Sequence, residues 1–342
     1  MKLNPIFTGG MVLAAYKPIR IFGQGKGRVS VSFLGYEHTL NSAGDDWLIE
    51  LPPAPYGGPH TMQLSLDGEA VTLSDVYLGE VILLHGQSNI EFKMRESSSP
   101  AESYQSCELL RMFSVQNMHR GERWEQRDGW IRCRADEVGD WSAIGYHVGM
   151  ELVKKKNCAV GLIACYEGAS VIQSWLPDGT MDEMGLFLQA SDLHRDHTSP
   201  VYSKWNGEGV LYRFMVEQLI PYSLSQVIWY QGESNASEAE GKVYHRLLAR
   251  LVEQRRRDFA DETLFFAVVQ LADTHKRMKE NNGWRLVQEA QMRVAQEMTG
   301  VATVVCRDIC ETDQIHPPTK GLLAHRIVEV VLNNIDQRIA GS

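Results

Sequence analysis

The chain has 342 residues, of which 44% are hydrophobic and 23% charged, as is ordinary for a soluble globular protein. Its formal net charge of −9 argues against a nucleic acid or an anionic membrane surface as a partner, because both are negatively charged. The sequence contains no run of roughly 18 apolar residues that could span a bilayer. The length allows a large core and more than one domain.

The first ten residues, MKLNPIFTGG, contain no apolar signal core. The six cysteines form no CxxC pair, so reduced thiols are the simplest account of them. We therefore expect a cytoplasmic protein, although a removed signal peptide would leave the same sequence. The sequence leaves open whether the protein forms a homo-oligomer.

Residues 1–75 are predicted to form a small antiparallel β-sandwich domain. Alternating apolar and polar residues, as in RVSVSF at 28–33, indicate half-buried strands, and turns rich in Gly and Pro separate these runs.

Residues 76–342 are predicted to form the second domain, an α/β fold with a mostly parallel sheet covered on both faces. Apolar strand patterns occur at 79–84, 110–115, 159–164, 226–230, 264–270 and 302–306. Helical patterns occur between them at 142–156, 244–259 and 284–299. Segments 92–132 and 176–205 are expected to be largely irregular. The basic run 255–257 is expected to be a solvated helix face.

The first chemical motif is GEVILLHGQSNIEF, residues 79–92, in which a buried strand ends in Gly86. Ser88 then lies at the carboxyl end of the strand and at the start of a helix. Backbone N–H groups there could stabilise an oxyanion, so Ser88 is a candidate nucleophile. The alternative is an ordinary N-cap serine.

A serine nucleophile needs a base, and the motif DQIHPPTKG provides His316 three residues after Asp313. In a turn, Asp313 could accept a hydrogen bond from the His316 ring and fix its tautomer. A chance D-x-x-H in a surface loop is the alternative. His194 and His197 lack a carboxylate framework in the sequence, so no metal site is predicted.

Two further strand-end motifs are VIWYQGESNA at 227–236 and GLIACYEGASVIQSW at 161–175. The first supplies the side-chain amides of Gln231 and Asn235, which could donate to an oxyanion, and the second supplies Gly168, where a backbone N–H could approach a substrate. Ligands bind at the carboxyl ends of the strands in such sheets.

Together these four motifs resemble the sialate O-acetylesterase family, carbohydrate esterases of the SGNH hydrolase superfamily. The resemblance implies a flavodoxin-like three-layer α/β/α domain and a reaction that needs no cofactor. It implies that Ser88 is the nucleophile, His316 the general base and Asp313 the residue that orients it. The oxyanion hole would consist of the N–H groups of Ser88 and Gly168 and the side chain of Gln231.

The sequence departs from the family pattern at His85, Ile90 and Glu167. The resemblance also implies an acetylated sugar or oligosaccharide as the substrate. Candidate substrate-binding residues are Gln87, Asn89, Glu233, Asn235, Trp175 and Trp284. Two other functions stay open at this point: a carbohydrate-binding protein without activity, and a lipase or thioesterase on the same scaffold.

Overall fold

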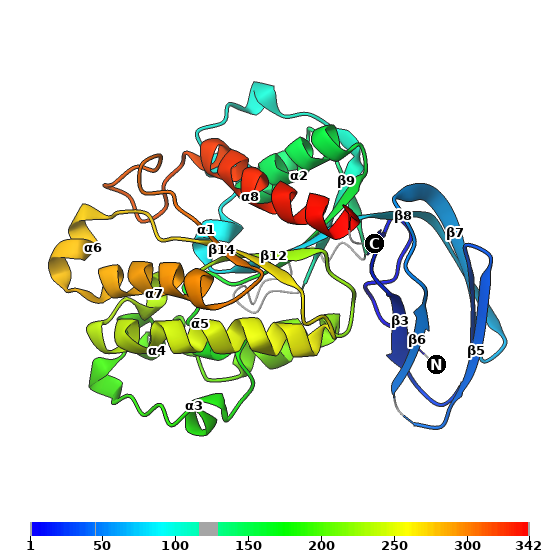
Figure 1. Ribbon diagram of the computed structural model, residues 1–342, viewed down its shortest axis with the longest axis horizontal. Coiled ribbons are helices and arrows are strands. Elements are labelled where there is room, and N and C mark those ends of the chain that lie inside the picture. Colours follow the sequence, from blue (N-terminus) through cyan, green and yellow to red (C-terminus); the bar gives the residue numbers. More distant parts are fainter. Residues whose placement is uncertain (1, 45, 116–128, 341–342) are drawn as a thin grey trace.

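The computed structural model describes residues 2–44, 46–115 and 129–340. Within these residues, a sheet of 11 strands contains the path β10–β9–β11–β8–β12–β13–β14 (Figure 1). All neighbours along this path pair in parallel except β10, which is antiparallel to β9. The bounds are β8 Glu69–Gly86, β9 Cys107–Ser114, β10 Ile131–Cys133, β11 Ala159–Tyr166, β12 Gln226–Tyr230, β13 Phe265–Val269 and β14 Val301–Val304.

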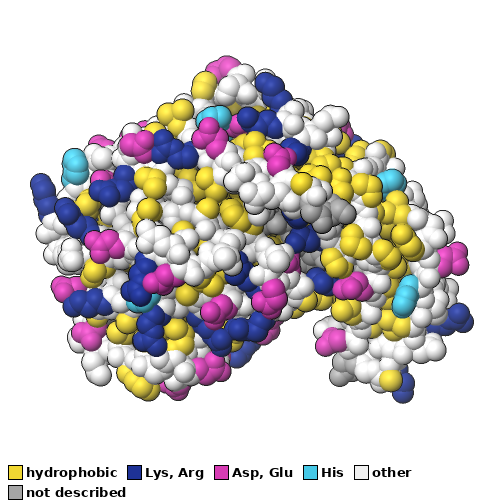
Figure 2. Space-filling model, in the orientation of Figure 1, with side chains coloured by type: hydrophobic (Ala, Val, Ile, Leu, Met, Phe, Trp, Pro, Cys, Tyr) yellow, Lys and Arg dark blue, Asp and Glu magenta, His cyan; other side chains and the backbone are white. Residues whose placement is uncertain are grey.

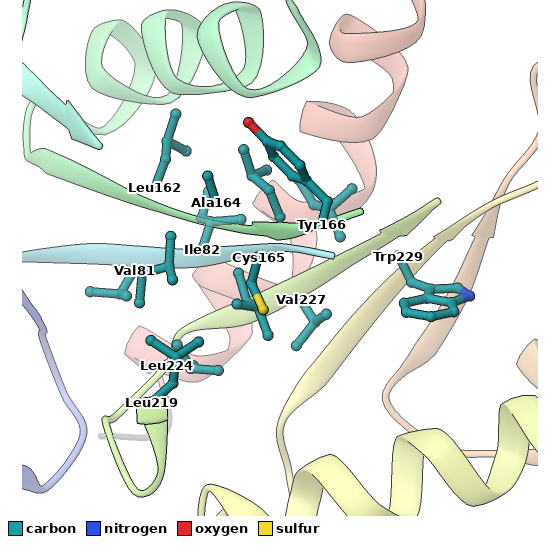
Figure 3. Packing of buried hydrophobic residues seen from close by; sticks show 14 of the residues in the cluster. Val81, Ile82, Leu162, Ala164, Cys165, Tyr166, Leu219, Leu224, Val227 and Trp229 are labelled. Carbon is teal, nitrogen blue, oxygen red and sulfur yellow. The ribbon is translucent and has the colours of Figure 1, made fainter. Parts of the chain in front are cut away.

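Helices cover this sheet on both faces, because its central strands are apolar on both sides. Helices α2 and α8 lie together over one face, and α5 and α7 lie over the other (Figure 1). Along β11, Leu162, Ala164 and Tyr166 point toward α2 and α8, whereas Cys165 points to the opposite face (Figure 3). The long helices are α2 Ala143–Lys156, α5 Glu238–Asp258, α7 Gly283–Glu297 and α8 Lys320–Ala340.

The mixed α/β fold with a large central sheet predicted from the sequence is confirmed. Each predicted strand and helix overlaps an observed one, but α5 begins six residues before the predicted range at 244. The start of α5 is fixed by Ser237, whose side chain accepts a hydrogen bond from the backbone of Glu240.

The N-terminal strands form two antiparallel groups. One is a separate sheet of β1 Lys2–Leu3, β3 Ile19–Gln24 and β6 Asp46–Leu51. The other joins β4 Gly27–Phe33, β5 Tyr36–Ser42 and β7 Gly57–Leu66 to the first half of β8. Strand β8 continues without a break past residue 75, the end of the predicted β-domain, into the central sheet. The division into two domains stays a prediction.

Several bonds join the N-terminal strands to the rest of the protein. The Tyr56 hydroxyl donates to Glu80 Oε1 at 2.5 Å, and Arg338 from α8 pairs with the same carboxylate. Lys17 pairs with Asp261 at 2.6 Å. On the face drawn in Figure 2, acidic and basic side chains are interspersed, and hydrophobic ones gather over the N-terminal strands.

The prediction that 255–257 is a solvated helix face is wrong for Arg255, which is fully buried, and for Arg256, which is also buried. Arg256 donates to the carbonyls of Leu264 and Thr299. Arg255 lies deeper. Its guanidinium contacts Asp258 at 3.1 Å, His85 Nε2 at 3.3 Å and the carbonyl of Trp175. A buried cation needs such partners, and Asp258 supplies the opposite charge.

The two segments expected to be largely irregular differ in the structure, since only segment 92–132 contains a strand of the central sheet. Segment 176–205 includes α3 Thr180–Glu183 and α4 Arg195–Thr198. Segment 92–132 includes β9 and part of β10, and its residues 116–128 lie outside the described residues. The other short helices are α1 Ser88–Glu91 and α6 His275–Glu280. None of the described helices combines the length and apolar composition needed to cross a membrane.

Candidate active site

Ser88 lies at the carboxyl end of the sheet, where the neighbouring parallel strands β8 and β12 approach each other closely. Gly86 has φ +134°, and a Cβ there would lie 2.2 Å from the carbonyl oxygen of Tyr230 on β12. Only glycine tolerates this conformation and approach. Gln87 is the N-cap of α1, so Ser88 is the first helical residue and not the N-cap. Its hydroxyl is therefore free for another partner.

That partner is His316, whose Nε2 lies 2.7 Å from Ser88 Oγ. Both residues are half-buried. Burial and the nearby charge of Lys320 lower the pKa of His316, and Glu96 opposes them only in part. The neutral ring is thus favoured. A neutral His316 that carries its proton on Nδ1 can accept the Ser88 proton at Nε2, as a general base must.

Two backbone N–H groups next to Ser88 Oγ are available for an oxyanion. Gly168 follows β11, and a Cβ on it would lie 3.9 Å from Ser88 Cβ. Within the described residues, the N–H groups of Ser88 and Gly168 donate no hydrogen bond. The Gly168 carbonyl accepts from Trp205 Nε1 at 3.2 Å. This bond fixes the peptide group that follows Gly168. Such unpartnered donors at a nucleophile suit the charge of a tetrahedral intermediate.

The structure places Gln231 differently from its predicted role as an oxyanion donor. Its Nε2 lies within hydrogen-bonding distance of Ser170 O at 2.9 Å, Asn235 Oδ1 at 2.8 Å and Gln87 Oε1 at 3.1 Å. Its Oε1 accepts from Tyr244 at 2.7 Å. Both amide hydrogens of Gln231 are donated to acceptors inside the protein. Gln231 therefore connects the loops behind the nucleophile instead of facing an oxyanion.

Asp313 is exposed, and no hydrogen bond joins its carboxylate to His316. Within the described residues, His316 Nδ1 has no hydrogen-bond partner. The structure therefore brings together Ser88, Gly168 and His316, but it does not show the predicted contact between Asp313 and the ring.

Trp175 and Trp284 were predicted to bind the substrate, and the structure corrects this prediction. Both side chains are buried. Trp175 packs edge-on against His85 and donates to Ser170 Oγ, and Trp284 donates to Ala272 O. A sugar ring cannot stack on an indole whose faces are already covered by the core.

The other predicted substrate-binding residues are also buried, directly behind the nucleophile: Gln87, Asn89, Glu233 and Asn235. Asn89 Nδ2 donates to Glu233 Oε1 at 2.5 Å, and Asn235 Oδ1 accepts from the Ile172 backbone at 2.9 Å. Gln87 accepts from Gln231, and Asn235 donates to Glu240, so these side chains bond the strand-end loops to one another.

His194 and His197 have carboxylate partners that the sequence did not reveal. His197 Nε2 lies 2.6 Å from Glu240 Oε1, and His194 Nδ1 lies 3.3 Å from Asp196. Asp196 also accepts from Ser234 at 2.7 Å. Among the described residues, no group of three or more His, Cys, Asp and Glu side chains is arranged to hold a metal ion. This cluster ties segment 190–206 to the loop after β12.

Sequence reasoning missed Lys320, the first residue of α8, which is fully buried and bonded to Asn89 Oδ1 at 2.6 Å. One signal could have revealed it. A cation at a helix N-terminus interacts unfavourably with the helix dipole, so a lysine at this position indicates a specific role elsewhere in the structure.

The chain is similar in sequence and fold to known carbohydrate esterases. A crystal structure of a carbohydrate acetylesterase from Xanthomonas citri matches 96% of this chain and 73% of its own, with TM-score 0.80 and 27% identity. Sialate O-acetylesterase from Homo sapiens is 26% identical over 322 residues, and that from Mus musculus is 23% identical over 342 residues.

The human match covers 84% of this chain and 60% of the human protein, so the chain spans less than two thirds of the length of that relative. The family model for carbohydrate esterases, sialic acid-specific acetylesterases, matches residues 78–332. That range contains Ser88, Gly168 and His316, together with the sheet that positions them. The chain therefore belongs to the sialic acid-specific acetylesterase family of carbohydrate esterases.

Proposed function

We propose that the protein is a serine esterase that removes O-acetyl groups from carbohydrate through an acetyl-serine intermediate. The observation that carries the proposal is the 2.7 Å contact between His316 Nε2 and Ser88 Oγ, beside two N–H groups that donate no hydrogen bond in the described part of the chain. Family membership supports the acetyl ester as the bond that is cleaved. The substrate is an acetylated sugar, such as sialic acid or an acetylated plant oligosaccharide.

The reaction proceeds in two halves. His316 Nε2 takes the Ser88 proton while Oγ bonds to the acetyl carbonyl carbon, and the resulting oxyanion is held by the N–H groups of Ser88 and Gly168. The bond to the sugar oxygen then breaks, and His316 returns the proton to that oxygen. In the second half, His316 deprotonates a water that attacks the acetyl-serine, and acetate leaves as Oγ regains its proton.

We further propose that the catalytic part is a flavodoxin-like three-layer α/β/α domain of the SGNH type, and that the N-terminal strands form a β-sandwich. The parallel order of the sheet and the helices on both of its faces support the first assignment. The antiparallel pairing of the N-terminal strands supports the second.

Hydrolysis of p-nitrophenyl acetate by the purified protein and by Ser88→Ala tests the chemistry. We expect the variant to keep its circular dichroism spectrum and Tm, because Ser88 adds little to the core, and to lose acetate release. A variant with near-wild-type turnover would show that Ser88 is not the nucleophile. A wild-type protein without turnover that still binds acetylated glycans would favour the binding-protein alternative.

The substrate class is tested with two series. Esters of increasing acyl length distinguish an acetylesterase, which prefers acetate, from a lipase or thioesterase, which prefers longer chains. Acetate release from acetylated sialic acid, xylo-oligosaccharide and manno-oligosaccharide then identifies the sugar. A preference for octanoate over acetate in the first series would overturn the proposal.

A further inference from the structure

A buried lysine lies beside the proposed catalytic pair, and the mechanism above does not use it. Lys320 begins α8, four residues after His316, and its side chain is inaccessible to solvent. Its ammonium lies 4.8 Å from the centre of the Phe92 ring and 5.5 Å from that of Tyr230. Two aromatic faces and one amide oxygen replace water around this charge.

Asn89 connects this lysine to the catalytic loop. Its Oδ1 accepts from Lys320 at 2.6 Å, and its Nδ2 donates to Glu233 Oε1 at 2.5 Å and to Ile315 O at 2.9 Å. Ile315 precedes His316, and Asn89 follows Ser88. A single buried amide therefore spans the nucleophile turn, the loop after β12 and the backbone that carries the base.

The two ionisable side chains bonded to Asn89, Lys320 and Glu233, are both buried. Burial lowers the pKa of Lys320 to about 8 and raises that of Glu233 to about 7. The other titratable groups facing Lys320 are Cys306, Cys310 and Glu311, from the segment between β14 and α8. Below pH 8 the ammonium form predominates, and its charge opposes protonation of His316.

His316 Nδ1 has no partner among the described residues, so apart from the contact with Ser88 the position of the ring depends on the loop that carries it. We propose that Lys320 is a positioning residue: its buried ammonium, bonded to Asn89, fixes the loop that carries His316 and places a positive charge on the same side of the site. The catalytic consequence rests on the proposed esterase function. The effect on the His316 ring does not, and it can be measured without any turnover.

The test is the NMR titration of the His316 imidazole in wild type, Lys320→Met and Lys242→Met, with His316→Ala to assign the signal. Methionine keeps most of the length of the side chain and removes its charge. Lys242 is an exposed lysine on α5 and serves as the matched control. We expect the His316 pKa to rise by about half a unit or more in Lys320→Met and to stay unchanged in Lys242→Met.

Because Lys320→Met leaves Glu233 buried opposite no cation, this variant risks misfolding. The pair Glu233→Gln and Glu233→Gln/Lys320→Met removes that problem, since glutamine can still accept from Asn89. We expect the double variant to have the higher His316 pKa and at least a tenfold lower kcat, with KM nearly unchanged. Equal His316 pKa values in these two variants would overturn the inference. Failure of wild-type turnover alone would overturn only the proposed function.

Discussion

At the residue scale, His316 sets the pH at which the proposed reaction can run. Burial and Lys320 lower its pKa below the ordinary histidine value of about 6.5. Because the base acts only when neutral, we expect kcat/KM to be constant near neutral pH and to fall as pH drops through a value below 6.5. The pH dependence of kcat/KM measures this fall. A midpoint well above 6.5 would contradict the direction of the shift.

Asp313 gives a second prediction at this scale. The carboxylate is exposed and makes no hydrogen bond to His316, so Asp313→Asn should lower kcat by less than about tenfold. In a serine protease whose aspartate holds the histidine, the same change costs about 10⁴ in kcat. Steady-state kinetics of the variant decide between these values. A loss near 10⁴ would mean that Asp313 contacts the ring during the reaction.

Gln231→Ala should act mainly on stability. The truncation removes the side-chain donor of the Ser170 carbonyl, at a cost of about 1–3 kcal/mol in the free energy of unfolding, whereas the Tyr244 hydroxyl keeps the Gln231 backbone carbonyl as an acceptor. An oxyanion donor would instead cost about 10²–10³ in kcat with little loss of stability. Urea unfolding and kinetics on one preparation separate the two. A full kcat loss at wild-type stability would restore the predicted oxyanion role.

At the element scale, hydrogen bonds between buried side chains connect the loops that follow β8, β11 and β12. Glu240, at the start of α5, accepts from His197, Asn235 and Ser237. Burial alone would raise the pKa of Glu240, but the hydrogen bonds from His197, the His194 backbone and Ser237 hold this pKa below its usual value. A depressed carboxylate stabilises the fold above its unfolded pKa, and this stabilisation is lost as pH falls through the folded pKa.

Glu240→Gln should therefore loosen segment 190–206, because the neutral amide cannot accept from all these donors at once. We expect faster amide hydrogen exchange in this segment and unchanged exchange in α2, which does not touch the cluster. Hydrogen exchange measured by mass spectrometry compares the two regions in one sample. Equal protection of 190–206 in both proteins would show that the cluster does not hold the segment.

Elements were easier to predict from this sequence than side-chain contacts. The strand before Ser88 and the helix at 143–156 follow from apolar runs and a serine cap, which are local signals. The contact of His316 with Ser88 also followed, since strand ends of a parallel sheet meet at one edge. Burial of Trp175 and Lys320 did not, because it depends on residues distant in sequence that pack around them.

At the scale of the whole molecule, the N-terminal strands are joined covalently and by pairing to the catalytic sheet. β2 Val12–Ala14 pairs in parallel with Tyr77–Gly79 of β8, inside the predicted catalytic domain. A fragment of residues 76–342 lacks β2 and the bond from Tyr56 to Glu80. We expect this fragment to unfold at a Tm at least 10 °C lower than the full chain, or not to fold cooperatively. Calorimetry of both proteins measures this difference, and an equal Tm would support independent domains.

The separation of 228 positions from Ser88 to His316 also determines when the site can form during synthesis. A nascent chain ending near residue 304 holds the nucleophile and every strand of the central sheet, yet it has neither the base nor α8. Ribosome-bound chains of increasing length should thus gain esterase turnover abruptly, only after the segment from His316 through α8 has been released and has docked. Turnover then reports completed folding of the carboxyl-terminal segment, whereas binding of a conformational antibody to the N-terminal strands reports an earlier stage.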